Sequence, residues 1–450
     1  MQVTETLADG LKREFKVVVP AAELDTRLLN RLDTLKNEVR IKGFRPGKVP
    51  VNHLRRLFGK SAMAEIVQNV VNEVARDTLT ERGERAAMQP DFKLPEDEKE
   101  ADKVLAGQAD LTYTMTYEVL PKIELQDFKN ISVERLTANI SDEEVEAEVN
   151  RLADNQRSFT PKDGKAEKGD RVTVSYVGKI DGAPFEGGTD DNAVLRLGTS
   201  QLIPGFAEQI EGMRAGEEKT ISVTFPENYG AKNLAGKAAT FDIKVKEVAA
   251  PDELKIDDEL AKRVGLESLD KLRQAIRQQM QNSLIALSRT HLKRHLLDQL
   301  DEMHKFDLPK GMVDQEFENI WNQVTSELAQ AGRTFESEGT SEEEARKDYR
   351  KIAERRVRLG LVLSEIGEKN KIAVTDEEAQ RGLTAQIRQF PGRERELIEY
   401  YRKNPEALAS VRAPIFEEKV VDFLLELVKV RDRTVSREEL EKAASTPDAA

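Results

Sequence analysis

A helical pattern runs almost without interruption from about residue 252 to residue 430, and it most limits what the chain can fold into. Residues 268–300 form its longest predicted helix, and residues 375–378 have the Thr-x-x-Glu spacing of a capping box at the start of another. No sustained heptad repeat accompanies the pattern. We therefore predict an all-α region of extended helices rather than a coiled coil.

The middle of the chain has a different pattern. Between residues 168 and 248 glycines are frequent, and the short runs 172–177, 220–225 and 239–245 alternate between apolar and polar residues. Alternation between turn residues is typical of strands in a compact β domain. We predict a mainly β domain here.

The first part of the chain mixes both patterns. Alternating residues predict strands over 11–20 and 109–119, and leucines at helical spacing predict a helix from about residue 21 that ends before Gly43. Residues 51–58 predict a short helix and residues 63–79 a second one. Together these elements indicate a small α+β domain.

A loop between the predicted helices presents large side chains. Residues 43–50, with the sequence GFRPGKVP, contain two glycines and two prolines that hold Phe44, Arg45 and Lys48 outside regular structure. Residues 27–60 carry ten Lys/Arg and two acidic residues, a local charge of +8 in a chain of net charge -13. Such a patch indicates a polyanionic partner, with RNA as the first candidate. From charge alone, a solvated basic face is the favoured alternative.

Composition limits the remaining possibilities. With 450 residues, 34% charged and 38% hydrophobic, the chain is long enough for about three domains. It contains no cysteine, so disulfides and thiolate chemistry are excluded. The first residues lack the basic and apolar segments of a signal peptide, and no apolar run is long enough to span a membrane. We expect a cytoplasmic protein.

Metal and nucleotide sites have little support. His291 and His295 lie four residues apart on a predicted helix, a spacing that can bind a metal, but no third ligand accompanies them. We expect a solvated helix face and no metal there. No phosphate-cradling glycine loop occurs, so neither a cofactor nor an ATP-driven cycle is expected.

The middle domain resembles the FKBP family of peptidyl-prolyl isomerases. The matching strings, in family order, are Val174-Ser-Tyr-Val-Gly178, Phe185-Glu-Gly-Gly188, Leu197-Gly198, Leu202-Ile-Pro-Gly-Phe206, Gly212-Met213, Gly216-Glu217, Phe225-Pro-Glu-Asn-Tyr-Gly230 and Thr240-Phe-Asp-Ile243. An ordered set of strings is far more specific than any single motif.

The resemblance implies a peptidyl-prolyl cis-trans isomerase with a mainly apolar pocket. It assigns the site to Tyr176, Phe185, Glu186, Leu202, Ile203, Phe206, Tyr229 and Phe241. Glu186 stands where many members carry Asp, Phe206 where many carry Trp, and Ala193 where an aromatic residue is common. Such a pocket needs no nucleophile or metal, because a dry aromatic environment favours the twisted amide over the planar one. Taken singly, each aromatic residue is better explained as core.

The loop is similar to the ribosome-docking motif of the bacterial trigger factor family, although Pro46 stands where some members have Lys. That family joins an N-terminal domain with this motif to an FKBP-type domain and a helical C-terminal domain. The resemblance implies a multidomain α+β fold, with an α+β ribosome-binding domain, an FKBP-like antiparallel β domain with a short helix, and an extended all-α domain. The expected boundaries are 1–115, a connector and helix over 116–155, the isomerase over 156–248, the helical domain over 249–432 and a flexible tail over 433–450.

The family resemblance also implies partners. The chain would bind the large ribosomal subunit near the polypeptide exit tunnel, through ribosomal protein and RNA, and would hold nascent and unfolded polypeptides without ATP. The docking residues would be Gly43, Phe44, Arg45, Pro46, Gly47 and Lys48. No membrane partner is expected, and a homodimer is one expectation for the chain off the ribosome.

Client binding needs scattered apolar spots in a polar field. The candidates are Met303, Phe306, Met312, Phe317, Trp321, Phe390, Tyr400, Tyr401 and Phe416, although several of these must pack helices together. Two other functions remain open at this point. In the first, the chain is an isomerase whose flanking domains recruit folded proteins. In the second, it is an RNA-binding protein in which the β domain has no catalytic part.

Overall fold

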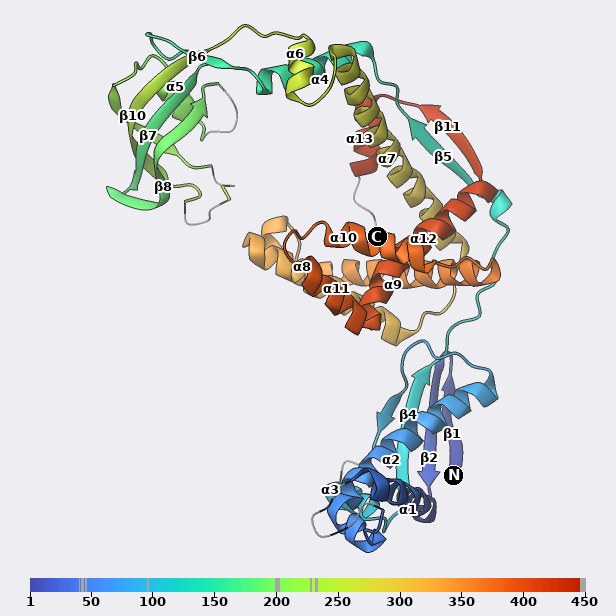
Figure 1. The fold of residues 1–450 in the computed structure, drawn as a ribbon. Coiled ribbons are helices and arrows are strands. Elements are labelled where there is room, and N and C mark those ends of the chain that lie inside the picture. The colour runs from blue at the N-terminus through green and yellow to red at the C-terminus, as the bar shows by residue number, and fades with distance from the viewer. Residues whose placement is uncertain are drawn as a thin grey trace. The chain divides into compact units, whose positions relative to one another are not determined.

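The structure is a computed structural model that describes residues 1–39, 41, 44, 47–94, 97–198, 203–226, 229–230 and 234–445. The chain forms two compact units, whose elements are labelled in Figure 1. The first consists mainly of Met1–Arg135 and His291–Asp432, and the second of Leu136–Thr290 and Arg433–Ala444.

A four-stranded antiparallel sheet opens the first unit, in the order β1-β2-β4-β3. Its strands are β1 (Gln2–Asp9), β2 (Lys12–Val19), β3 (Asp91–Lys93) and β4 (Leu111–Glu118). Strand β4 alternates between buried and half-buried residues, as predicted. All eight residues of the edge strand β1 are exposed, so no alternation in the sequence marks it.

Helices α1 (Ala21–Glu38), α2 (Val51–Arg82) and α3 (Glu98–Leu105) accompany this sheet (Figure 1). Helix α1 buries Leu24, Leu28 and Leu32 in the same hydrophobic cluster as the sheet. The prediction of two helices over 51–58 and 63–79 was wrong, because α2 is continuous. Gly59 costs a helix about 1 kcal/mol relative to alanine, and the buried residues of α2 on both sides of it offset that cost.

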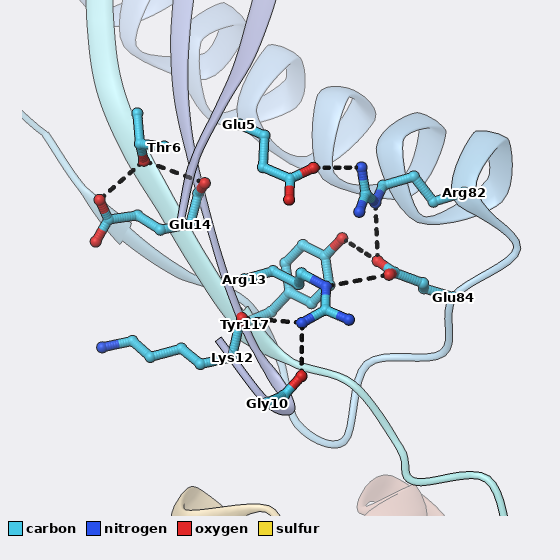
Figure 2. A network of polar contacts seen from close by, with 9 residues as sticks. All are labelled: Glu5, Thr6, Gly10, Lys12, Arg13, Glu14, Arg82, Glu84 and Tyr117. Carbon is cyan, nitrogen blue, oxygen red and sulfur yellow. Dashed lines mark hydrogen bonds and ion pairs between the residues drawn. The ribbon is translucent and has the colours of Figure 1, made fainter. Parts of the chain in front are cut away.

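A polar network joins the end of α2 to the sheet (Figure 2). The Glu84 carboxylate accepts hydrogen bonds from Arg13 Nε at 3.2 Å, Arg82 Nε at 3.0 Å and the Tyr117 hydroxyl at 2.8 Å. Arg82 also pairs with Glu5 of β1 at 2.7 Å. Burial by itself would raise the pKa of Glu84, but the hydrogen bonds outweigh it and lower that pKa below its ordinary value.

The rest of the first unit is mainly helical. Its helices are the C-terminal part of α7 (Leu269–Met303), α8 (Lys310–Ala331), α9 (Glu342–Lys369), α10 (Asp376–Ile387), α11 (Glu394–Lys403) and α12 (Pro405–Leu427). The predicted capping box between Thr375 and Glu378 is present at the start of α10. Glu378 also pairs with Lys419 of α12 at 2.7 Å, and these contacts lower the pKa of Glu378 to about 2.

The second unit contains a five-stranded antiparallel sheet, in which β6-β10-β7-β8 are neighbours and β9 pairs with β10. The strands are β6 (Phe159–Pro161), β7 (Arg171–Ile180), β8 (Ala183–Arg196), β9 (Glu218–Thr224) and β10 (Ala238–Pro251), and the short helix α5 (Phe206–Ile210) precedes β9. Helices α4 (Asp142–Asn155) and α6 (Asp258–Arg263) belong to this unit too. The predicted multidomain α+β architecture is confirmed.

Residues 433–445 differ from the flexible tail expected over 433–450. Strand β11 (Lys429–Thr434) pairs with β5 (Ser132–Thr137), and helix α13 (Arg437–Ser445) follows. Leu440 of α13 is fully buried in a hydrophobic cluster with Leu136 and Leu284. A single leucine and a few alanines in a charged segment are too weak a pattern to predict this packing.

We expect Glu84→Gln to destabilise the N-terminal sheet by about 1–3 kcal/mol at pH 7, because the arginines lose their charged acceptor. Since the folded-state pKa of Glu84 is lowered, its contribution is fully present above the ordinary glutamate pKa of about 4.3 and is lost as the pH falls below that value. Amide hydrogen exchange in β2 and β4 of the full chain, at pH 7 and near pH 3, measures both effects. The control is Glu14→Gln, whose carboxylate accepts from the Thr6 hydroxyl at 2.9 Å. Equal protection of wild type and Glu84→Gln at pH 7 would contradict this prediction.

Candidate functional site

Six aromatic side chains of the second unit come together, and we call them the aromatic cluster. They are Tyr176 on β7, Phe185 on β8, Phe206 at the start of α5, Phe225 after β9, Tyr229 in the following loop and Phe241 on β10. Tyr176 and Phe241 come from paired strands, because Phe241 is the partner of Gly178 and Ile243 the partner of Tyr176. The sheet register therefore brings residues far apart in sequence to one place.

The rings of the aromatic cluster pack mostly edge to face. Phe241 is central, with ring centroids 5.2 Å from Phe206, 5.7 Å from Tyr176 and 6.0 Å from Phe185. Phe185 also lies 6.0 Å from Phe225, whose ring is 4.7 Å from that of Tyr229. Such pairs contribute about 0.5–1.5 kcal/mol beyond burial and hold each ring in a defined orientation.

The predicted pocket residues differ in exposure. Phe206 and Phe241 are buried, Tyr176, Phe185 and Ile203 are half-buried, and the Tyr229 side chain is 39% exposed. Glu186 is exposed. Leu202 lies outside the described residues. The structure thus brings Tyr176, Phe185, Phe206, Tyr229 and Phe241 together and leaves one face of Tyr229 open to solvent.

Phe225 is a member of the cluster that sequence reasoning did not assign to the pocket. It is 3% exposed and connects Phe185 to Tyr229. Its place at the start of the string Phe225-Pro-Glu-Asn-Tyr-Gly230 is the signal that would have found it.

Two glycines leave room for the rings. A Cβ atom on Gly178 would lie 2.7 Å from ring carbons of both Phe185 and Phe241, and one on Gly188 would lie 2.7 Å from Phe185. Neither glycine has a positive φ angle. Space, rather than backbone conformation, therefore requires glycine at these two positions.

Within the aromatic cluster, the pKa of the Tyr176 hydroxyl differs from its ordinary value. Burial raises the pKa of the Tyr176 phenol above its ordinary value, and the Asp190 carboxylate and Tyr229 add to the increase. The phenol is therefore neutral at pH 7 and can donate a hydrogen bond. The arrangement offers an apolar aromatic surface with phenol hydroxyls beside it, of which that of Tyr176 is held neutral.

The loop between α1 and α2 contains the predicted docking residues. Gly43, Arg45 and Pro46 lie outside the described residues. The Phe44 side chain is 38% exposed, and its ring lies against the imidazole of His53 in α2, with centroids 5.1 Å apart. Phe44 is thus supported from one side and accessible from the other.

The end of the same loop is ordered by its backbone. The Gly47 N–H donates to the Lys36 carbonyl at 2.9 Å, and Gly47 has a φ of +77°, a region that favours glycine. Val49 is buried, and Lys48 beside it is exposed. This anchoring places Lys48 at the surface.

The basic patch is partly neutralised within the fold. Five of its cations form ion pairs, Arg27 with Glu73, Arg31 with Glu65, Lys36 with Asp33, Arg55 with Asp25 and Lys60 with Asp102. Four of these five acids lie outside residues 27–60. The net positive charge of the patch in the folded protein is therefore smaller than the +8 counted along the sequence. Within the described part of the patch, Lys48 and Arg56 form no ion pair. The uncompensated charge therefore lies at the loop and the first turns of α2.

The predicted client-binding residues of the helical region separate into two groups. Phe317 and Trp321 are buried in a hydrophobic cluster, and Met303, Phe306, Met312 and Phe416 are partly buried against such clusters. Phe390 and Tyr400 are 50% and 54% exposed, and Tyr401 is half-buried. Packing alone therefore leaves Phe390 and Tyr400 accessible to a partner.

His291 and His295 lie side by side on α7. The rings of His291 and His295 lie 4.3 Å apart, and His291 is buried rather than solvated as the sequence predicts. Among the described residues, no group of three or more His, Asp or Glu side chains is placed to hold a metal ion.

Family models match most of the chain in three consecutive stretches. Residues 1–152 match "Bacterial trigger factor protein (TF)", residues 162–246 match "FKBP-type peptidyl-prolyl cis-trans isomerase" and residues 268–426 match "Bacterial trigger factor protein (TF) C-terminus". The Trigger factor of Brucella abortus is 57% identical over 440 residues, which cover 98% of this chain and 93% of that protein. The chain belongs to the trigger factor family.

Other trigger factors agree with this assignment. That of Sinorhizobium fredii is 55% identical over 98% of this chain and 90% of its own length. A solved structure titled "Promiscuous Substrate Recognition in Folding and Assembly Activities of the Trigger Factor Chaperone" covers 95% of this chain and 99% of its own, with a TM-score of 0.53 and 20% identity. The structural match shows that the two chains share a fold.

Membership in the trigger factor family establishes the function. The chain is a ribosome-associated chaperone that binds unfolded polypeptides, and its FKBP-type region is a peptidyl-prolyl cis-trans isomerase. The two alternatives, a recruiter of folded proteins and a plain RNA-binding protein, are set aside. No helix within the described ranges is both long and apolar enough to cross a bilayer.

Gly178→Ala tests the packing of the aromatic cluster. The new methyl group overlaps Phe185 and Phe241, so we expect the FKBP-type region to lose about 1–3 kcal/mol of stability. Hydrogen exchange of β7 and β10 in increasing urea measures the loss. Gly164→Ala is the control, because its Cβ meets only Lys162 side-chain carbons at 3.9 Å or more. Equal urea midpoints for the two variants would show that the rings can move aside.

Proposed function

We propose that the aromatic cluster is the site at which this trigger factor family member isomerises X-Pro bonds. The proposed site residues are Tyr176, Phe185, Glu186, Leu202, Ile203, Phe206, Tyr229 and Phe241, with Phe225 added by its ring contacts. The observation that carries the proposal is the continuous set of rings that ends at the partly exposed Tyr229. A client proline is a small apolar ring, and this face suits it.

The proposed mechanism uses the environment of the amide rather than a reactive group. Rotation about an X-Pro bond meets a barrier of about 20 kcal/mol, much of it from the resonance that keeps the amide planar and polarised. Against aromatic rings that exclude water, the planar amide loses solvation, and the less polar twisted state is favoured. The neutral Tyr176 hydroxyl can donate to a carbonyl of the client.

We expect Tyr229→Ala to lower kcat/KM for a short proline peptide by about tenfold, which corresponds to about 1.4 kcal/mol of transition-state stabilisation. The loss follows from removing the exposed ring on which the proline would lie. A protease-free isomerisation assay by NMR exchange measures it. Tyr400→Ala removes another exposed tyrosine, 54% accessible and on α11, and should leave kcat/KM unchanged. Unchanged activity in Tyr229→Ala would move the site away from this residue.

We further propose that the loop between α1 and α2 docks on the large ribosomal subunit beside the exit tunnel, on ribosomal protein and RNA. Phe44 and Arg45 act as anchors, Lys48 faces phosphate, and Gly43, Pro46 and Gly47 shape the loop. Two observations support this proposal: Phe44 is exposed on its His53 support, and Lys48 has no ion-pair partner within the described residues. An exposed aromatic ring beside free cations suits a mixed protein and RNA surface.

Replacing Phe44, Arg45 and Lys48 by alanine is expected to abolish co-sedimentation with vacant ribosomes at moderate salt. Lys48→Ala alone, which removes the proposed phosphate contact, should reduce the slope of log K against log salt by about 1. The matched control is the alanine triple variant of Phe390, Arg393 and Lys403, which removes an exposed ring and two cations from the helical region. Co-sedimentation that persists in the loop variant would refute the docking assignment.

We also propose a role for each part of the chain. The proposed ribosome-binding part is residues 1–115, the connecting part 116–155, the isomerase part 156–248 and the client-binding part 249–432. The chain would act in the cytoplasm, without ATP, and would form a homodimer off the ribosome. Analytical ultracentrifugation of the ribosome-free protein over a range of concentrations tests the dimer.

A further inference from the structure

A cleft of about 670 Å³ lies among α7, α8, α9 and α12 in the helical part of the first unit. Its apolar lining comes from Leu297, Met312, Val357, Leu359, Leu361 and Leu363. At its rim Arg356 pairs with Glu316 at 3.2 Å. The volume falls within the range of about 300–1,000 Å³ that is typical of ligand-binding clefts.

Gly360 lies on the wall of this cleft, in the interior of the 28-residue helix α9. Glycine is the least favourable helix residue after proline. Gly360 is exposed, and a Cβ atom placed on it would meet nothing within 4 Å. Neither packing nor a positive φ angle therefore requires glycine here.

Two other helix glycines of the same region show the contrast. A Cβ on Gly367, two turns further along α9, would overlap the Phe416 ring, and one on Gly382 of α10 would lie 2.8 Å from Ile415. Packing within the fold requires glycine at both of these positions. At Gly360 the space beside the backbone is open, so another molecule can occupy it.

We propose that this cleft is a client-binding site, in which an apolar side chain of an extended unfolded segment lies over Gly360. The proposal rests on the chaperone function and names one place where the chain performs it. A bare helix backbone allows the client to approach closely, and the surrounding leucines and valine supply apolar contact.

The chemistry of the lining fits unfolded segments of varied sequence. Met312 is half-buried, and its flexible thioether adapts to side chains of different shape, as methionines do on promiscuous binding surfaces. The cleft also carries charged side chains of both signs, Arg294, Arg355, Arg356, Glu316 and Glu417, and Arg356 pairs with Glu316. The cleft therefore selects apolar character rather than sequence.

The test compares the full-length wild type with Gly360→Leu, Gly360→Ala and Ala329→Leu. The probe is a fluorescein-labelled, proline-free peptide of Gly and Ser with a central Leu-Phe-Leu, and its partner peptide has Ser at those three positions. Gly360→Ala removes the helix penalty and adds one methyl group, whereas Gly360→Leu also fills the cleft. Ala329→Leu adds a similar side chain at an exposed position of α8 outside the cleft.

By fluorescence anisotropy, we expect Gly360→Leu to bind the apolar peptide about tenfold more weakly than the wild type. Gly360→Ala should change the affinity by less than about twofold, Ala329→Leu should bind like the wild type, and the Ser peptide should bind weakly to all four proteins. Unchanged affinity in Gly360→Leu, or an equal loss in Ala329→Leu, would overturn the proposal.

A second measurement needs no variant of the chaperone. A photoreactive benzoylphenylalanine at the centre of the peptide should cross-link the wild type at Met312 and within residues 357–364. Cross-links confined to other regions would overturn the cleft while leaving the chaperone function intact. Ribosome co-sedimentation of Gly360→Leu should equal that of the wild type, which separates failure of this proposal from failure of ribosome docking.

Discussion

Apolar side chains are scarce in this chain, and this scarcity shapes the rest of the structure. Hydrophobic residues make up 38% of the sequence and charged residues 34%. The described residues bury their apolar side chains in six separate hydrophobic clusters rather than in one large core. Because each cluster stabilises its own neighbourhood, docking, isomerisation and client binding can occupy different parts of one chain.

Small cores leave many helix contacts to charged side chains. Arg355 and Arg358 of α9 pair with Asp298 and Asp301 of α7 at 2.5 Å and 2.6 Å, and both arginine side chains are only 16% exposed. Such partly buried pairs lose solvation, but breaking one would leave an uncompensated charge, so they favour one alignment of the two helices. The polar network around Glu84 acts in the same way at the end of α2.

The sequence predicted the local elements that have strong patterns. The alternation in β4, the leucine stripe of α1 and the capping box at Thr375 all correspond to observed elements. Weak or absent patterns account for the elements that were missed. Strand β1 is exposed throughout, and the buried Leu440 of α13 stands alone in a charged segment.

The candidate sites also contain residues that the sequence identified and residues that only the structure identified. The ordered FKBP-like strings identified the isomerase region and most of its rings from sequence, and the glycine- and proline-rich loop identified the docking segment. The strings did not assign Phe225 to the ring set, because its role depends on contacts with Phe185 and Tyr229.

The sequence by itself determined the family, the order of the three kinds of fold and the identity of the loop, because these depend on local patterns and on strings of neighbouring residues. Only the tertiary structure decided which cations of the basic patch remain unpaired and which aromatic residues of the helical region stay exposed. It also decided that Gly360 borders an open cleft, whereas Gly367 packs against Phe416. These properties depend on distances between residues far apart in the chain, and no local pattern encodes them.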